Sequence, residues 1–354
     1  MRPLKVFVLT VLLAVTAGLA MGCASLGSSS PAPQPARVVF KEVWGYLLRG
    51  DESDMSGVEP FTNICYFSAD VAKDGRIKDA VQRPTVISSD GSRPEIYLVI
   101  TELSNSALSH FSLSPDYGVR PLLISDICRI SQDFDGVQID FESVSPDDAG
   151  AFWDFLKELR AQLPPEKKLS VAVPARAGLK TDAYMYSQIA GIVDRIVVMA
   201  YDEHWGTSAP GPVASLPWCS AVLDYAQSTI ESDKLIMGVP LYARAWQDKR
   251  LARAMGLQKV QSIIAEKSAT PGYTSEVGPY FEYSENVVVK VYYDDLRSLG
   301  EKLQLYKSKD VSSVAFWRIG LGPSDLWSTV SSEKLASIPP DDQGRLGFPP
   351  DSQY

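Results

Sequence analysis

The stretch FDGVQIDFES, residues 134–143, contains two carboxylates whose spacing suits acid–base chemistry. Polar and apolar side chains alternate along it, so a β-strand would turn one polar set to the same face, namely Gln138, Asp140 and Glu142. Neighbouring carboxylates that are shielded from water raise each other's pKa, because each negative charge disfavours the other. A proton shared by Asp140 and Glu142 would leave Glu142 as a potential general acid near neutral pH.

The same alternation has two other interpretations that involve no catalysis. It fits a buried polar cluster that only fixes the register of a strand, and it also fits an edge strand with one face in water. The pattern of this stretch alone does not separate these interpretations from an acid–base site.

Short β-rich segments alternate with helical patterns between residues 38 and 337. Eight such segments occur, at residues 42–47, 62–68, 95–101, 134–142, 169–174, 192–201, 235–242 and 313–317. Several are almost continuously apolar, which is typical of parallel strands covered by helices. The pattern predicts an α/β fold, a (β/α)8 TIM barrel. In such a barrel Val137, Ile139 and Phe141 suit the helix-facing side, and Glu142 lies nearest the C-terminal mouth.

The interval between the seventh and eighth segments is too long for a single crossover. It contains a helical pattern near residues 260–267, followed by YFEYSENVVVKVYY, which predicts a hairpin with a three-residue turn. We expect residues 243–295 to form a small α+β insertion between strands seven and eight, along one side of a groove.

The first residues are typical of an export signal. Arg2 and Lys5 precede an apolar run that ends at Cys23, so residues 1–22 are predicted to be a signal peptide. The sequence Ala20-Met21-Gly22-Cys23 is similar to a lipoprotein cleavage site. This similarity predicts a lipid anchor at Cys23 and a place in the cell envelope, with simple secretion as the alternative.

Two further segments lack the composition of a packed domain. Residues 23–37 are rich in Ser, Pro and Ala and are predicted to be a flexible tether. Residues 338–354 are rich in Pro, Gly and Asp and are predicted to be a disordered tail. Residues 38–337 are therefore expected to form the barrel domain.

The composition argues against several classes of partner. The formal net charge of −9 disfavours a nucleic-acid partner, and a membrane contact is expected only through the anchor at Cys23. The chain has two histidines, and no cysteine pair has metal-ligand spacing, so neither a metal nor another cofactor is expected. Cys65 and Cys128 lie in apolar runs and are expected to be small buried residues without a disulfide.

Four segments, taken in order, resemble motifs of glycoside hydrolase family 18, the chitinase-like barrels. They are DGVQIDFE at 135–142, MAYDEHW at 199–205, MGVPLYARAW at 237–246 and VAFWRIG at 314–320. The first resembles the DGxDxDxE signature of the family. Residues 201–218 are also similar to the subgroup of spore-cortex-lytic and cell-wall N-acetylglucosaminidases. The resemblance covers nearly all of residues 40–337.

The resemblance implies substrate-assisted, retaining cleavage of β-1,4 linkages in glycans that contain N-acetylglucosamine, such as peptidoglycan or chitooligosaccharides. Glu142 would then protonate the glycosidic oxygen, Asp140 would orient the 2-acetamido group, and Tyr201 would donate a hydrogen bond to that group. The residues that would bind substrate are Met199, Asp202, Trp317 (as the floor under the sugar), Tyr46, Tyr242, Trp205 and Gln138. We expect Asp135 to support the site from behind, and His204 and Trp246 to lie along the groove.

The chain departs from the family pattern at two places. Gln138 replaces the middle aspartate of the signature, and an amide can hydrogen-bond Asp140 but cannot take up its proton. The family's Ser-x-Gly-Gly segment on the third strand is absent, and residues 101–105 stand in its place. A lectin-like barrel that binds glycans without cleaving them is the main alternative, although retention of Glu142 favours an enzyme. The protein is expected to be a monomer. A third alternative is a lipoprotein scaffold that binds another envelope protein, but no motif in the sequence indicates this function.

Overall fold

The computed structural model describes residues 35–247, 252–284, 287–323 and 325–337. The predicted signal peptide, the anchor at Cys23 and the predicted tail lie outside the described residues. Among the residues that are described, no helix combines the length and the apolar character that are needed to cross a bilayer.

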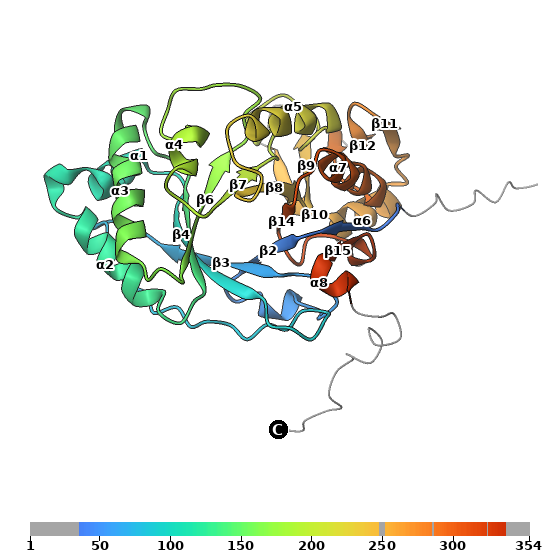
Figure 1. The fold of residues 1–354 in the computed structure, drawn as a ribbon. Helices are drawn as coiled ribbons and strands as arrows, with labels where there is room; N and C mark the ends of the chain where they lie inside the picture. Colours follow the sequence, from blue (N-terminus) through green and yellow to red (C-terminus); the bar gives the residue numbers. More distant parts are fainter. Residues whose placement is uncertain (1–34, 248–251, 285–286, 324, 338–354) are drawn as a thin grey trace, which may run out of the picture. The chain divides into compact units, whose positions relative to one another are not determined.

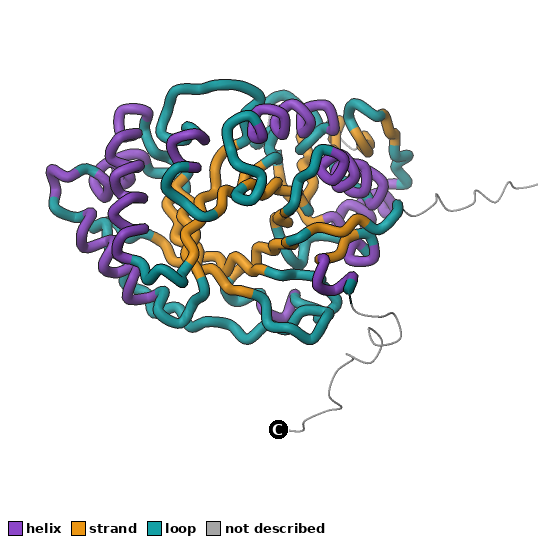
Figure 2. Tube along the Cα trace, viewed as in Figure 1, coloured by secondary structure: helices purple, strands orange, loops and turns teal. Residues whose placement is uncertain are grey.

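Eight parallel strands close into a barrel in the order β14-β2-β3-β4-β5-β6-β7-β8. Their bounds are β2 Glu42–Leu48, β3 Asn63–Asp70, β4 Glu95–Glu102, β5 Gly136–Phe141, β6 Lys168–Pro174, β7 Arg195–Met199, β8 Leu235–Pro240 and β14 Ser313–Trp317. Each strand contains the core of one segment predicted from the sequence, which confirms the (β/α)8 barrel. Figure 2 shows the strands as a ring with helices around it.

The helices cover the outer face of the barrel (Figure 1). They are α1 Ser106–Leu113, α2 Arg120–Ile130, α3 Ala149–Gln162, α4 Tyr186–Ala190, α5 Leu216–Gln227 and α7 Leu296–Ser308, with short 3-10 turns η1 Glu52–Asp54, η2 Pro115–Tyr117, η3 Pro146–Asp148 and η4 Leu326–Ser328. Near the chain ends, β1 Val38–Phe40 pairs in parallel with β15 Val330–Ser332, and α8 Glu333–Ala336 follows.

Strand alternation separates the outer core from the barrel interior. Val137, Ile139 and Phe141 face the helices, as predicted, and Phe141 stacks on Phe155 of α3 with ring centroids 5.8 Å apart. The interior is filled by a second cluster, made of Trp44, Tyr46, Cys65, Tyr97, Val99, Val197, Ile236 and Ala315. Cys65 is fully buried, as expected, whereas Cys128 is only partly buried because it packs at the edge of the outer core.

The segment between β8 and β14 forms a five-stranded antiparallel sheet with one helix. Its elements are β9 Tyr242–Gln247, β10 Arg253–Gly256, α6 Leu257–Lys267, β11 Gly272–Thr274, β12 Gly278–Ser284 and β13 Val288–Tyr292, in the sheet order β10-β9-β13-β12-β11. β12 and β13 pair as the predicted hairpin. The Leu257 N–H donates to the Leu321 carbonyl at 2.7 Å, which ties the start of α6 to the loop after β14.

Candidate active site

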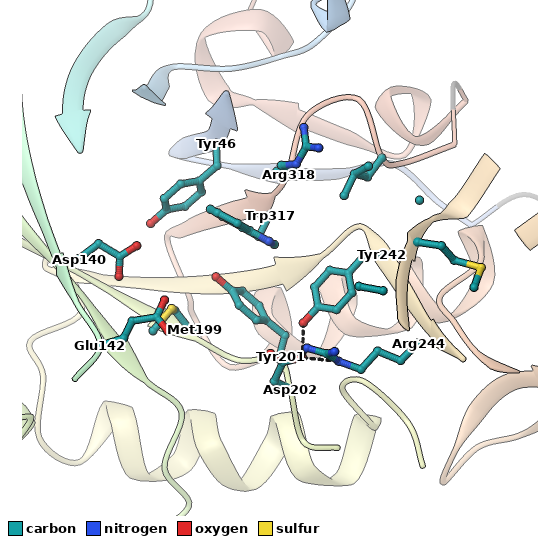
Figure 3. Close-up of a pocket in the computed structure, with 14 residues that line it drawn as sticks. Tyr46, Asp140, Glu142, Met199, Tyr201, Asp202, Tyr242, Arg244, Trp317 and Arg318 are labelled. Atoms are coloured by element: carbon teal, nitrogen blue, oxygen red, sulfur yellow. Dashed lines mark hydrogen bonds and ion pairs between the residues drawn. The ribbon is translucent and has the colours of Figure 1, made fainter. Parts of the chain in front are cut away.

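A cavity of about 420 Å³ lies at the carboxyl ends of the barrel strands, where enzymes of this architecture place their active sites (Figure 3). Its lining residues come from the barrel and from the insertion: Tyr46, Asp140, Glu142, Met199, Tyr201, Asp202, Tyr242, Arg244, Ala254, Met255, Gly256, Trp317, Arg318 and Leu321. Segments far apart in the chain therefore meet at a single cavity.

Asp140 and Glu142 lie together on one wall of this cavity. Burial, and then the charge of Glu142, raise the pKa of the Asp140 carboxyl to about 8. Burial, followed by the charges of Asp202 and Glu102, also raises the pKa of Glu142. Because the two carboxyls interact, they titrate as a pair, and the pair retains a proton at neutral pH.

Gln138 lies beneath this pair and is fully buried. Its Nε2 donates to Ser170 Oγ at 3.2 Å, and within the described part of the chain its Oε1 has no hydrogen-bond partner. The Asp140 Oδ1 and Tyr46 hydroxyl atoms are also buried without a partner there. Gln138 is buried and does not line the cavity, so the expectation that it contacts substrate is wrong; its side chain instead contacts Ser170 of β6.

Tyr201 stands opposite the carboxylate pair (Figure 3). Burial raises the pKa of its phenol well above the ordinary value, so the hydroxyl remains a donor at neutral pH. The ring fits because Gly238 of β8 has no side chain: a Cβ there would lie 3.0 Å from Tyr201 Cε1 and 2.8 Å from the Val198 carbonyl oxygen. Met199, at the end of β7, lines the same cavity.

Asp202 anchors a second group of polar residues. Its Oδ1 accepts hydrogen bonds from the Tyr242 hydroxyl at 2.5 Å, from Arg244 Nη2 at 2.7 Å and from Arg244 Nε at 2.9 Å. Asp202 has a left-handed backbone with φ of 60°, a conformation that aspartate tolerates better than most residues. The group joins the loop after β7 to β9 and fixes the side of the cavity next to Tyr201.

Trp317, at the end of β14, is held between two other aromatic rings. The Tyr46 and Phe67 rings each meet it nearly edge to face, with centroids 5.1 Å away. Its backbone carbonyl accepts from the Leu241 N–H at 2.6 Å. The indole is therefore supported from the barrel interior while it also lines the cavity, as a stacking platform for an apolar sugar face would.

Comparisons with known proteins identify the family of the chain. The model of the family described as "Glycosyl hydrolases family 18" matches residues 123–322. The chain belongs to glycosyl hydrolase family 18, and it is a glycosidase.

Among its relatives, the chain is 28% identical over 341 residues to the putative sporulation-specific glycosylase YdhD of Bacillus subtilis (strain 168), covering 90% of this chain and 81% of YdhD. It is 28% identical over 316 residues to the cortical fragment-lytic enzyme of Bacillus anthracis, covering 83% of this chain and 71% of that enzyme. The crystal structure of the Bacillus cereus spore cortex-lytic enzyme SleL superposes with a TM-score of 0.72 at 25% identity, over 86% of this chain and 77% of SleL.

Three residues that are expected along the groove lie outside the lining of this cavity. Trp205 does not line the cavity; its side chain is 54% exposed and its indole N–H donates to Thr207 Oγ1 at 2.9 Å. His204 packs over Gly211 with Nδ1 3.0 Å from the Pro212 carbonyl oxygen. Trp246 is buried in the insertion, where its indole N–H donates to the Ser208 carbonyl. All three contact residues of the loop after β7, and their place along the groove stays a prediction.

The expectation for Asp135 is also wrong. Asp135 precedes β5, so it lies at the amino end of the barrel, a whole strand away from Glu142. Its Oδ2 accepts the Ile96 N–H at 2.7 Å and pairs with Arg83 Nη2 at 2.5 Å. Asp135 therefore holds the start of β4 and does not support the site.

Other residues of the site were not predicted. Arg244 follows Tyr242 by two positions, so strand alternation already indicated that both side chains share a face. Phe67 and Met255 carried no comparable signal, because an aromatic residue in a strand and a methionine in an insertion are ordinary core residues. Arg318 belongs to the motif at residues 314–320, but its place in the cavity depends on the path of the loop after β14.

Proposed function

We propose that this glycosidase cleaves β-1,4 bonds after N-acetylglucosamine, with retention of configuration and with the 2-acetamido group of the substrate as the nucleophile. The observation that carries the proposal is the convergence of Asp140, Glu142, Tyr201 and Trp317 on one cavity. The relatives named as cortex-lytic enzymes support peptidoglycan fragments as the natural substrate, with chitooligosaccharides as an alternative.

In the first half of the reaction, a hexosamine stacks on Trp317, and the proton that the Asp140–Glu142 pair shares passes through Glu142 to the glycosidic oxygen. This transfer leaves Asp140 as a carboxylate. The acetamide oxygen attacks the anomeric carbon as the bond to the leaving sugar breaks, which forms a cyclic oxazolinium ion. The Tyr201 hydroxyl donates to the acetamide oxygen and positions it for attack. Asp140 accepts from the acetamide N–H and balances the positive charge that develops on the ring.

In the second half, water enters on the side vacated by the leaving sugar. The Glu142 carboxylate removes a proton from this water while its oxygen attacks the anomeric carbon and the oxazolinium ring opens. Glu142 thereby regains the proton that it donated, and the acetamide is restored. Two successive inversions leave the product with the configuration of the substrate.

The test is turnover of chitooligosaccharides and peptidoglycan by the purified protein, with Glu142→Gln as the matched variant. We expect wild type to release a sugar that NMR detects first as the β-anomer, and the variant to lose most of its kcat. Equal turnover by both proteins would remove Glu142 as the acid. Binding by both without turnover would instead support a carbohydrate-binding barrel.

We also propose that the protein is exported, anchored through a lipid on Cys23, and active as a monomer in the cell envelope. The sequence of residues 1–23 supports export and anchoring, and a cavity formed within one chain supports a monomer. Metabolic labelling with a fatty-acid analogue should mark wild type but not Cys23→Ala. Release of unlabelled wild type into the medium would support simple secretion.

A further inference from the structure

Arg318 follows Trp317 directly, and its backbone is held by the barrel. The Trp317 carbonyl accepts from the Leu241 N–H at 2.6 Å, and the Ile319 N–H donates to the Tyr46 carbonyl at 3.0 Å. Arg318 is thus tied to a strand end on either side, and its side chain lines the cavity. A side chain anchored in this way is a pre-organised contact for a ligand.

The two arginines of the cavity differ in how many of their donors are used. Arg244 directs both Nε and Nη2 to Asp202. Arg318 uses only Nη1 within the described part of the chain, for Asp51 Oδ2 at 3.0 Å and the Ile319 carbonyl at 3.4 Å. A guanidinium has five N–H groups, so Nε and Nη2 of Arg318 are left for a ligand.

Asp51 forms an ion pair with Arg318 but neutralises its positive charge only in part. The Asp51 side chain is 42% exposed and therefore hydrated, whereas the Arg318 side chain is 21% exposed. An arginine that is partly shielded from water and has two adjacent free donors suits a planar carboxylate, which it can bind through two parallel hydrogen bonds.

The position of Arg318 indicates which part of the glycan it meets. In Figure 3, Arg318 lies beyond Trp317 from Asp140 and Glu142. A sugar stacked on Trp317 presents its anomeric carbon to Glu142, so its opposite end, which bears the preceding sugar of the chain, faces Arg318. A carboxylate on that preceding sugar would therefore reach the guanidinium.

We propose that Arg318 binds the carboxylate of an acidic sugar that precedes the N-acetylglucosamine at the site, namely the 3-O-lactyl group of N-acetylmuramic acid. This inference rests on the proposed function and names its substrate class. Chitin carries no carboxylate, and a stem peptide converts the lactyl carboxyl into a neutral amide. The preferred substrate is therefore glycan from which an amidase reaction has already removed the peptides.

The test compares kcat/KM on three soluble glycans: chitohexaose, peptide-free N-acetylglucosamine–N-acetylmuramic acid strands, and the same strands with their lactyl carboxylates converted to methyl amides. Wild type should prefer the acidic strands to the amidated strands. Arg318→Gln should reduce this preference about tenfold, which is the effect of losing a charged hydrogen bond. Arg318→Lys, which retains the charge without the planar fork, should lose less.

Asp51→Asn is the matched control, because it breaks the same ion pair from the other side. If Arg318 only joined two loops, Asp51→Asn and Arg318→Gln would lower turnover of all three glycans alike, and this result would overturn the inference. Equal kcat/KM of wild type on acidic and amidated strands would also overturn it, while turnover of both would leave the proposed function intact.

Binding to Glu142→Gln separates the inference from the chemistry. Calorimetry should show that this variant binds acidic fragments more tightly than amidated ones, and that adding Arg318→Gln removes the difference. This result would support the carboxylate site even if wild type proved unable to hydrolyse either glycan, in which case only the proposed function would fail. Equal affinity for the two fragments would overturn the carboxylate site.

Discussion

The two ends of the barrel interior both contain polar side chains, but they differ in whether these side chains have hydrogen-bond partners. At the amino end, the first residues of four strands pair with one another: Glu42 accepts from Arg195 at 2.9 Å, and Asn63 donates to Glu95 at 3.1 Å. At the mouth, by contrast, the described structure leaves buried polar atoms of Tyr46, Gln138 and Asp140 without partners.

The hydrogen bonding of the two ends indicates a different role for each. A buried polar group that is fully paired contributes to stability, whereas one left without a partner costs free energy unless a ligand completes it. The amino end therefore closes the fold. At the mouth, Tyr46 and Asp140 line the cavity, and their partners are expected to arrive with the substrate, whereas Gln138 lies buried outside the lining. Changes at the mouth should lower activity, and changes at the amino end should lower stability.

The largest expected effect comes from Asp140→Asn at the mouth. Loss of the carboxylate that balances the developing charge should lower kcat by about 10²–10³-fold, as removal of one preorganised electrostatic group does in other enzymes. Thermal unfolding monitored beside the kinetics should show no loss of stability. A large fall in melting temperature with an unchanged kcat would show that Asp140 contributes to stability and not to catalysis.

The stability of this variant relative to wild type should depend on pH. In folded wild type the pKa of Asp140 is raised to about 8, whereas an unfolded aspartate has a pKa near 4. Between about pH 4 and pH 8, Asp140 therefore binds more protons in the folded state than in the unfolded state. Its contribution therefore falls as pH rises through this window. Asp140→Asn should gain stability relative to wild type as pH increases from about 4 to 8, which chemical denaturation at several pH values measures.

Arg195→Met at the amino end should behave in the opposite way. It leaves Glu42 partly buried without its cation, which should lower the free energy of unfolding by about 2–3 kcal/mol. Because Arg195 begins β7, far from the mouth, kcat of the folded fraction should stay near the wild-type value. Denaturant melts and kinetics at low temperature check both parts, and a selective loss of kcat would contradict them.

Phe67→Ala should give a smaller effect at the mouth. It removes one of the two rings that support Trp317, an edge-to-face contact of about 1 kcal/mol. We expect KM to rise about fivefold with little change in kcat. Tyr66→Phe, on the adjacent outward-facing position of β3, is the control and should leave KM unchanged.

The smallest expected effect is a shift of the pH profile. Gln138→Asp would place a third carboxylate below Asp140, and a like charge raises a neighbour's pKa. The alkaline limb of kcat/KM should move up by about half a pH unit or more. A shift of this limb to lower pH would show that Gln138 does not lie against Asp140.

The barrel was predictable because its signal is local and repeated. An alternation of period two marks each strand, and it correctly divided Val137, Ile139 and Phe141 from Asp140 without any knowledge of the partner strands. The acid pair followed from the same alternation, since its two members lie two residues apart on one strand.

The rest of the site depends on where separate loops meet. Gly256 and Leu321 reach the cavity only because the insertion docks on the loop after β14, and no local pattern encodes that contact. Trp205 is a related case: a motif fixes its position in the chain, but its indole N–H donates to Thr207 and its side chain does not line the cavity. Asp135 belongs to the same motif as Glu142 and still lies at the other end of the strand.

The mechanism depends on burial, which keeps a proton on the carboxylate pair at neutral pH. A ¹³C NMR titration of the aspartate side-chain carboxyls, with Asp140→Asn for assignment, detects this proton. We expect the Asp140 signal to change near pH 8, well above the other aspartates. A transition of the Asp140 signal near pH 4, where exposed carboxyls titrate, would show instead that this group is ionised at neutral pH.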